Sequence, residues 1–150
     1  VGIIGTGGAA KACIYGLKNE GADVTLFARD IKNAEALADE FGVKFKDISA
    51  LNADRNSLDC LINATPLGTI GELENQTPIG RAQLKNLHLA YDLVYNPIET
   101  RFLREAKNFG VPAIGGLEMF IAQGRKQFEI WTGLAAPEKI MRNAALQRLK

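Results

Sequence analysis

The chain has 150 residues, 47% of them hydrophobic, a length that suits one well-filled core rather than two ordinary domains. Its 18 basic and 17 acidic residues leave a formal charge of +1 without a cluster of lysine and arginine, which argues against nucleic acid as a partner. We find neither a signal peptide nor an apolar run long enough to cross a bilayer, so no membrane partner is expected.

Short apolar runs rich in β-forming residues alternate with helical patterns, which predicts βαβ units and a parallel sheet covered on both faces. The predicted strands are, in chain order, Val1 to Ile4, Asp23 to Phe27, Val43 to Phe45, Leu58 to Asn63, Leu87 to Val94 and Val111 to Ile114. The predicted helices are Ala9 to Asn19, Ile31 to Phe41, Glu99 to Asn108, 117–131 and 137–149. The glycine- and proline-rich stretch from Ala64 to Gly80 is predicted to be a long loop, a kind of segment that is often functional.

The two C-terminal helices have apolar sides that the predicted sheet does not obviously cover. In the helix over 117–131, one apolar stripe is formed by Leu117, Ile121, Phe128 and Trp131. In the helix over 137–149, one side is formed by Met141, Ala145 and Leu149. The chain begins inside a strand without an initiator Met, so we expect a domain before Val1 to be missing and the two helices to contact it.

A glycine turn links the first predicted strand to the first predicted helix. Gly5, Gly7 and Ala10 fit the pattern G-x-G-x-x-G/A, in which the glycines make a tight turn and let the backbone approach a pyrophosphate. The free N–H groups near Gly8 and Ala9, together with the helix dipole, favour an anion at this point. The sequence therefore predicts an α/β fold with a doubly wound parallel sheet, a Rossmann-like dinucleotide-binding domain.

The end of the second strand indicates which nicotinamide cofactor is bound. NAD sites usually place an acidic residue there, whereas NADP sites offer an arginine to the 2′-phosphate. Ala28 stands where the acid is expected, Arg29 follows it, and Lys32 adds a second positive charge, which favours NADP. Asp30 leaves NAD open as the less favoured alternative, because it either caps the next helix or reaches the ribose.

Four segments of the chain resemble, in the same order, the motifs of shikimate dehydrogenases. They are Gly5-Thr-Gly-Gly-Ala-Ala-Lys-Ala12, Asn63-Ala-Thr-Pro-Leu-Gly68, Tyr91-Asp-Leu-Val-Tyr-Asn-Pro97 and Gly116-Leu-Glu-Met-Phe-Ile-Ala-Gln-Gly124 with Gln127-Phe-Glu-Ile-Trp-Thr-Gly133. The resemblance implies the NADPH-dependent reduction of 3-dehydroshikimate to shikimate in the biosynthesis of aromatic amino acids. It also implies a small-molecule substrate, held between this domain and an N-terminal domain.

The resemblance further implies a role for particular residues. The pyrophosphate is held by Gly5, Thr6, Gly7, Gly8 and Ala9, and the 2′-phosphate by Arg29. The cofactor is bordered near its nicotinamide by Asn63, Ala64, Thr65, Leu93, Gly116 and Met119. Tyr95 and Gln123 reach the substrate hydroxyls, and this agrees with their positions at the carboxyl end of a strand and off the apolar stripe of a helix.

The chain departs from the family in two respects. The family usually has Asn-Arg-Thr where this chain has Ala28-Arg29-Asp30, and often an arginine at Asn33. Its proton-relay lysine and aspartate belong to the N-terminal domain, so we assign no catalytic residue and expect the chain alone to bind cofactor without turnover. The alternatives are an NAD-linked quinate or shikimate dehydrogenase, and a ligand sensor of the same fold without activity.

The remaining reactive side chains predict no further site. Cys13 and Cys60 have neither the number nor the spacing of a disulfide framework or a metal site, which favours a reducing cytoplasm. His88 is the only histidine and is expected to be packed or solvated, and Lys11 is expected to be a surface cation. We therefore predict no metal.

Overall fold

The computed structural model describes residues 1–51 and 58–149. Within these residues, six strands form one sheet in the order β3-β2-β1-β4-β5-β6, and every neighbouring pair is parallel. The strands are β1 (Gly2–Ile4), β2 (Thr25–Ala28), β3 (Lys44–Asp47), β4 (Cys60–Asn63), β5 (Leu89–Asp92) and β6 (Ala113–Ile114). This order confirms the doubly wound fold, because the chain runs outward from β1 to one edge and then from β4 to the other.

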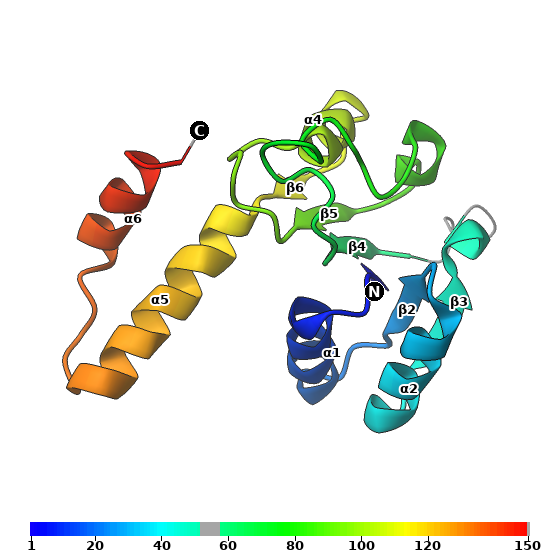
Figure 1. The fold of residues 1–150 in the computed structure, drawn as a ribbon, viewed down its shortest axis with the longest axis horizontal. Coiled ribbons are helices and arrows are strands. Elements are labelled where there is room, and N and C mark those ends of the chain that lie inside the picture. Colours follow the sequence, from blue (N-terminus) through cyan, green and yellow to red (C-terminus); the bar gives the residue numbers. More distant parts are fainter. Residues whose placement is uncertain (52–57, 150) are drawn as a thin grey trace.

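Helices cover both faces of the sheet (Figure 1). They are α1 (Gly8–Asn19), α2 (Ile31–Phe41), α4 (Arg101–Asn108), α5 (Gly116–Thr132) and α6 (Glu138–Leu146), with short 3-10 turns η1 (Ile48–Ala50) and η2 (Arg81–Leu84). Helices α1 and α2 lie on one face, and α4 and η2 on the other. In the part of the chain that the structure describes, none of these helices has the length and apolar character needed to cross a membrane.

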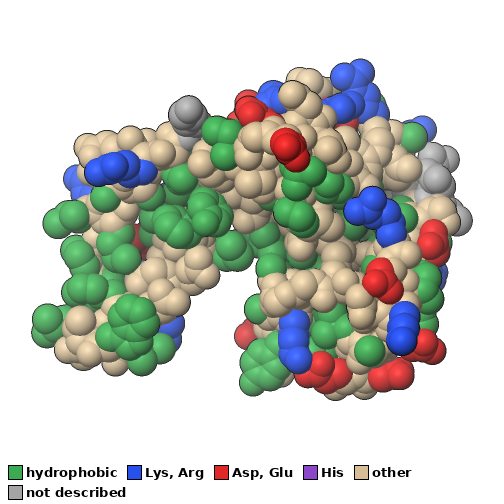
Figure 2. Space-filling view, viewed as in Figure 1, with side chains coloured by type: hydrophobic (Ala, Val, Ile, Leu, Met, Phe, Trp, Pro, Cys, Tyr) green, Lys and Arg blue, Asp and Glu red, His purple; other side chains and the backbone are tan. Residues whose placement is uncertain are grey.

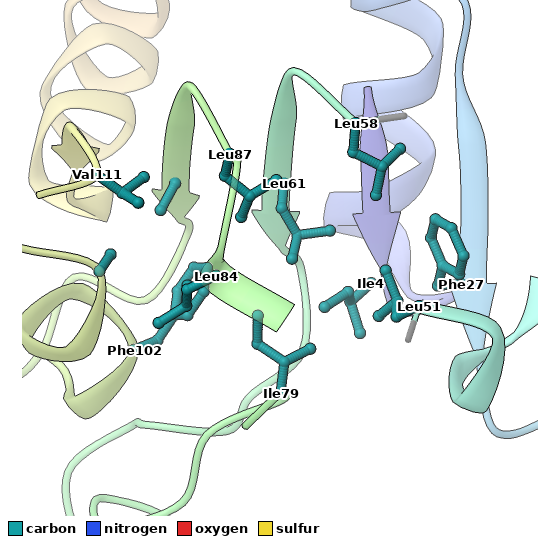
Figure 3. Packing of buried hydrophobic residues seen from close by; sticks show 12 residues of the cluster. Ile4, Phe27, Leu51, Leu58, Leu61, Ile79, Leu84, Leu87, Phe102 and Val111 are labelled. Carbon is teal, nitrogen blue, oxygen red and sulfur yellow. The ribbon is translucent and has the colours of Figure 1, made fainter. Parts of the chain in front are cut away.

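Alternation of side chains along the strands creates two separate cores. Neighbours such as Ile3 and Ile4 point to opposite faces, since the side chains of a strand have a period of two. Figure 3 shows one core, in which Ile4, Phe27 and Leu61 from three adjacent strands point to the side where Phe102 of α4 lies. The other core is closed by α1 and α2 through Ala10, Ile14, Ala34 and Leu37.

Helix α2 begins and ends where the sequence predicts. The carboxylate of Asp30 accepts a hydrogen bond from the backbone N–H of Asn33 at 3.1 Å, which satisfies one of the free donors at the start of the helix. Gly42 ends the helix in the left-handed conformation, with φ at 60°.

Helices α5 and α6 form an antiparallel pair, residues 116–146, which we call the α5–α6 arm (Figure 1). Leu117 and Ile121 are buried as predicted, but Trp131 is 78% exposed, so the predicted apolar stripe is buried only in its first half. The physical reason is that α5 leaves the sheet after its first turns. The apolar side of α6 packs on α5, where Met141 lies against Gly124.

Ion pairs hold the two helices of the arm together. Both terminal nitrogens of Arg142 bind the carboxylate of Glu118, at 2.7 and 2.8 Å. Arg125 binds Glu138 at 3.0 Å. The hydrogen bonds from Arg142 lower the pKa of Glu118, and these exposed pairs fix the angle between the helices more than they stabilise the fold.

Candidate functional site

Two adjoining cavities lie at the carboxyl ends of β1 and β4, where the sheet changes direction and where ligands bind in such folds. The first, of about 290 Å³, we call the glycine-loop cavity, and its lining includes Gly5, Thr6, Gly7, Ala28, Arg29 and Asp30. The second, of about 460 Å³, we call the tyrosine cavity, and its lining includes Ala9, Thr69, Leu93, Val94, Tyr95 and Met119. Ala64, Thr65 and Pro66 line both, so the two cavities form one continuous trough.

The glycine turn leaves its backbone open to the trough. Gly5 has φ at +116° and lies so close to β4 that a Cβ there would be 2.9 Å from the carbonyl oxygen of Ala64. At Gly7 and Gly8, by contrast, a Cβ would meet nothing within 4 Å. No side chain caps α1 and no acidic residue lies in its first turn, so its free N–H groups face open space. This arrangement suits an anion such as a pyrophosphate.

The three residues after Phe27 have different places in the site. Ala28 is buried beneath the glycine-loop cavity, and Arg29 lines it with an exposed side chain that forms no ion pair with any described residue. Both carboxylate oxygens of Asp30 accept hydrogen bonds from Asn33, one from its backbone N–H and one from its side chain at 2.7 Å. Lys32 is exposed on α2 and lines neither cavity. The structure thus brings Arg29 to the cavity and engages Asp30 as a helix cap.

Asn63 lies behind the wall of the trough rather than in it. Its side chain is fully buried, and its Oδ1 accepts hydrogen bonds from the backbone N–H and the hydroxyl of Thr65, at 3.0 and 2.7 Å. Its Nδ2 donates to the carbonyl oxygen of Leu67 at 3.1 Å. Of the predicted segment Asn63 to Thr65, therefore, only Ala64 and Thr65 line the cavities, and Asn63 holds Thr65 from behind.

Asp92 is a site residue that the sequence reasoning missed. Its buried carboxylate accepts hydrogen bonds from Asn63 Nδ2 at 2.9 Å, the Val94 N–H at 3.0 Å and the Thr100 hydroxyl at 2.5 Å. Burial raises the pKa of Asp92, and the three hydrogen bonds oppose this effect. The sequence did contain a sign of this role. An aspartate at the end of an apolar strand is buried when the strand is, and it then needs polar partners.

Gly116 brings the start of α5 against the end of β5. Its N–H donates to the carbonyl oxygen of Val94 at 3.2 Å, and a Cβ on Gly116 would lie only 2.4 Å from the carbonyl oxygen of Leu93. This close approach places Met119, one turn along α5, in the wall of the tyrosine cavity opposite Ala64 and Thr65. The predicted residues Leu93, Gly116 and Met119 therefore lie together.

The predicted substrate residues Tyr95 and Gln123 lie on either side of Phe120. The ring of Tyr95, 38% exposed, stacks on that of Phe120 with centroids 4.6 Å apart. Gln123 is one turn further along α5 and lines a different cavity, of about 490 Å³, between α5 and α6. Figure 2 shows a wide opening between the α5–α6 arm and α1, on the side to which the arm projects.

The remaining candidates lie outside the trough. The side chain of His88 is exposed and 3.6 Å from Asp59, and Lys11 pairs with Glu40 at 2.6 Å on the surface of α1. Cys13 and Cys60 are half-buried, and burial raises the pKa of both thiols.

Two family models match the chain. Residues 116–146 match the model described as shikimate 5′-dehydrogenase C-terminal domain. Residues 1–85 match the model described as NADP oxidoreductase, coenzyme F420-dependent. The first match coincides with the α5–α6 arm, and the second begins before β1, includes the glycine turn and reaches past β4.

Curated proteins and solved structures match the chain over almost its whole length. Shikimate dehydrogenase (NADP(+)) of Maridesulfovibrio salexigens is 39% identical, over 98% of this chain and 54% of that protein. Shikimate 5-dehydrogenase from Thermus thermophilus, in complex with NADP(H) and shikimate, has a TM-score of 0.88 at 36% identity, over 99% of this chain and 54% of that one. Quinate dehydrogenase from Corynebacterium glutamicum, in complex with NAD, has a TM-score of 0.89 at 29% identity, over 97% and 54%. The chain spans about half the length of the relatives it matches.

Proposed function

The chain belongs to the shikimate dehydrogenase family, and we propose that it is the cofactor-binding half of an enzyme that reduces 3-dehydroshikimate to shikimate with NADPH. One observation carries the choice of cofactor. Arg29 lines the cavity beside the open glycine turn and has no ion-pair partner among the described residues, whereas Asp30 is engaged by Asn33. An arginine in this place fits a 2′-phosphate, which NADP carries and NAD lacks.

The trough fits a dinucleotide along its length. The N–H groups of Gly7, Gly8 and Ala9 hold the pyrophosphate, with Gly5 and Thr6 shaping the turn beneath it. Arg29 holds the 2′-phosphate, and Lys32 adds positive charge nearby. The nicotinamide half occupies the tyrosine cavity, whose wall includes Ala64, Thr65, Leu93 and Met119, and Gly116 packs against Leu93 beside it. Bound NADPH supplies the hydride for ketone reduction.

The described residues supply contacts to a substrate but not the proton that ketone reduction requires. Tyr95 presents its hydroxyl at the mouth of the tyrosine cavity, and Gln123 presents its amide beyond Phe120. Among the described residues that line the tyrosine cavity there is no histidine, lysine or carboxylate to donate a proton. We therefore expect the donor to come from the part of the family's chain that this chain does not span.

The α5–α6 arm is the surface that meets that other part. Apolar side chains gather along the arm in Figure 2, and the largest exposed ones are Ile130, Trp131, Leu134 and Ile140. The arm borders the wide opening seen in Figure 2, so a domain seated on the arm would close this opening over the substrate. The half-buried thiols Cys13 and Cys60 fit a reducing compartment such as the cytoplasm.

Cofactor binding is tested on the purified chain of 150 residues. We expect NADPH emission to change on binding, with a Kd below about 1 mM, because the trough is built within this chain. We expect no oxidation of shikimate by NADP, because the proton acceptor of the reverse reaction lies elsewhere. Absence of any change at millimolar NADPH, or turnover by the chain alone, would contradict the proposal.

The role of the arm is tested through Trp131, the only tryptophan of the sequence. Adding the separately produced amino-terminal half of the Maridesulfovibrio salexigens relative is expected to shift the emission of Trp131 to shorter wavelength, because an exposed indole becomes covered. Ile140→Asp, at another exposed apolar residue of the arm, is expected to weaken this association, whereas Tyr15→Asp, at an exposed residue of α1, should leave it unchanged. A complex that forms without any shift would place the interface elsewhere.

NAD is the second candidate, and one observation in a relative favours it, namely the NAD complex of the quinate dehydrogenase. Asp30 would then bind the ribose and give up part of its cap on α2. The variants described in the Discussion separate the two cofactors.

A further inference from the structure

Two loops form the facing walls of the tyrosine cavity, and each begins where a strand ends. The first runs from Asn63 to Leu67 after β4, and the second from Leu93 to Tyr95 after β5. The backbone ladder between the two strands ends with the hydrogen bond from the Leu93 N–H to the Asn63 carbonyl at 3.0 Å. Further along the chain, the backbone N–H of Ile70 donates to the carbonyl oxygen of Asn96 at 2.9 Å. Between these two backbone bonds, side chains supply the described hydrogen bonds that connect the two loops.

The carboxylate of Asp92 connects both loops. Its Oδ1 accepts from the side chain of Asn63 in the first loop and from the N–H of Val94 in the second. Asn63 in turn receives both the N–H and the hydroxyl of Thr65, which lines the cavity. Two hydrogen bonds in series therefore join Asp92 to a residue on the cavity wall that it does not itself reach.

The other oxygen of Asp92 adds a third anchor. Its Oδ2 accepts from the hydroxyl of Thr100, and the same hydroxyl oxygen accepts the N–H of Leu103 at the start of α4. Thr100 also packs closely on Gly68, the residue that follows the first loop, because a Cβ on Gly68 would lie 3.3 Å from its side chain. The carboxylate of Asp92 thus connects both walls of the cavity to the N-terminal end of α4.

The side chain that connects the two loops and α4 is an acidic one. Asp92 is fully buried, and no basic side chain among the described residues pairs with it. Burying a charge in this way is costly unless several donors converge on it. An asparagine of the same shape offers only one acceptor oxygen, so at least one of the three donors would lose its partner.

We propose that Asp92 is a positioning residue that holds Thr65 and the Val94 backbone in register, and so shapes the tyrosine cavity for the nicotinamide half of the cofactor. The inference rests on the proposed function, because it assigns that half of the cofactor to this cavity. Asp92 itself lines neither cavity. Of the two groups that it holds, Val94 lines only the tyrosine cavity whereas Thr65 lines both, so we expect its main influence on the tyrosine cavity. The glycine-loop cavity is anchored separately by Gly5 and α1.

The test compares two probes on the 150-residue chain. NADPH emission reports the surroundings of the nicotinamide, whereas adenosine 2′,5′-bisphosphate occupies only the glycine-loop cavity. In Asp92→Asn we expect the emission change at saturating NADPH to fall by half or more, and NADPH affinity to fall about tenfold. The affinity for adenosine 2′,5′-bisphosphate, measured by calorimetry, should stay within about twofold of the parent.

Control variants show whether an effect of Asp92→Asn comes from the hydrogen bonds of this carboxylate. Glu105→Gln removes another buried carboxylate, one that pairs with Arg101 on α4 away from the trough, and it should leave the NADPH emission unchanged. Thr100→Val should reproduce the loss and Thr100→Ser should restore it, because serine keeps the hydroxyl that reaches Asp92. If Asp92→Asn does not fold, the comparison of Thr100→Val with Thr100→Ser tests the positioning role instead.

The outcomes separate the inference from the proposed function. A folded Asp92→Asn chain with the parent's emission change, or one that loses affinity for both probes equally, would overturn the positioning role. A parent chain that binds neither probe would overturn the proposed function, and the inference with it.

Discussion

Replacing Arg29 with alanine is expected to weaken NADPH binding about 10- to 100-fold while NADH binding changes little, because charge-assisted hydrogen bonds to a phosphate are lost only with NADPH. The guanidinium lines the glycine-loop cavity and has no ion-pair partner among the described residues, so no compensating interaction is released by the change. Parallel titrations of the parent chain and Arg29→Ala with NADPH and NADH, followed by emission or calorimetry, measure the effect.

Two neighbouring variants serve as controls for Arg29. Lys32→Ala removes a nearby cation that lines neither cavity, so the affinity for NADPH should fall by less than about threefold. Asp30→Ala removes the cap on α2 and should lower the free energy of unfolding by about 1 kcal/mol with little change in either affinity. If Asp30→Ala instead abolished NADH binding while Arg29→Ala left NADPH binding intact, the chain would be NAD-dependent.

Replacing Gly116 with alanine is expected to lower the free energy of unfolding by at least about 3 kcal/mol, because the new methyl group has no space. A Cβ there would lie 2.4 Å from the carbonyl oxygen of Leu93 and 2.5 Å from that of Val94, both of them backbone atoms that cannot rotate away. The start of α5 must move, and Met119 with it, so NADPH binding is expected to weaken as well. Urea denaturation followed by circular dichroism measures the first effect, and NADPH emission the second.

Gly16→Ala is the matched control for this prediction. Gly16 lies inside α1, and a methyl group added there would meet nothing within 4 Å, so alanine should stabilise the chain by about 0.5–1 kcal/mol. A Gly116→Ala chain as stable as the parent, with undiminished NADPH binding, would show that α5 does not depend on this close approach.

The fold was predictable because its signals are local. Each strand is a short apolar run and each helix has its own periodicity, so the alternation that defines a doubly wound sheet is visible without any long-range information. The caps at Asp30 and Gly42 are equally local, and the structure has both. The glycine turn and Arg29 were predicted in the same way from the ends of two predicted strands, whereas roles for Ala64, Thr65 and Tyr95 were implied by the resemblance to shikimate dehydrogenases.

Three features were not predicted from the sequence pattern, because they depend on which side chains the fold brings together. Asn63 was placed in the cavity wall, but its side chain is buried behind it, because its partners come from Thr65, Leu67 and Asp92. Asp92 and Thr100 were not assigned, although eight positions apart they share a 2.5 Å hydrogen bond. The apolar stripe predicted along α5 did not indicate that only its first half is buried on the sheet, with Trp131 exposed where α5 leaves it.

The sequence by itself determined the fold class, the anion-binding turn and the arginine beside it, because these depend on residue type and on spacing within a few positions. Only the tertiary structure decided which polar side chains face the trough and which support it from behind. That distinction depends on the contact between Asn63 of β4 and Asp92 of β5, which lie 29 residues apart in the chain. They meet only when parallel strands bring their carboxyl ends together, and Thr100 before α4 then joins them through Asp92.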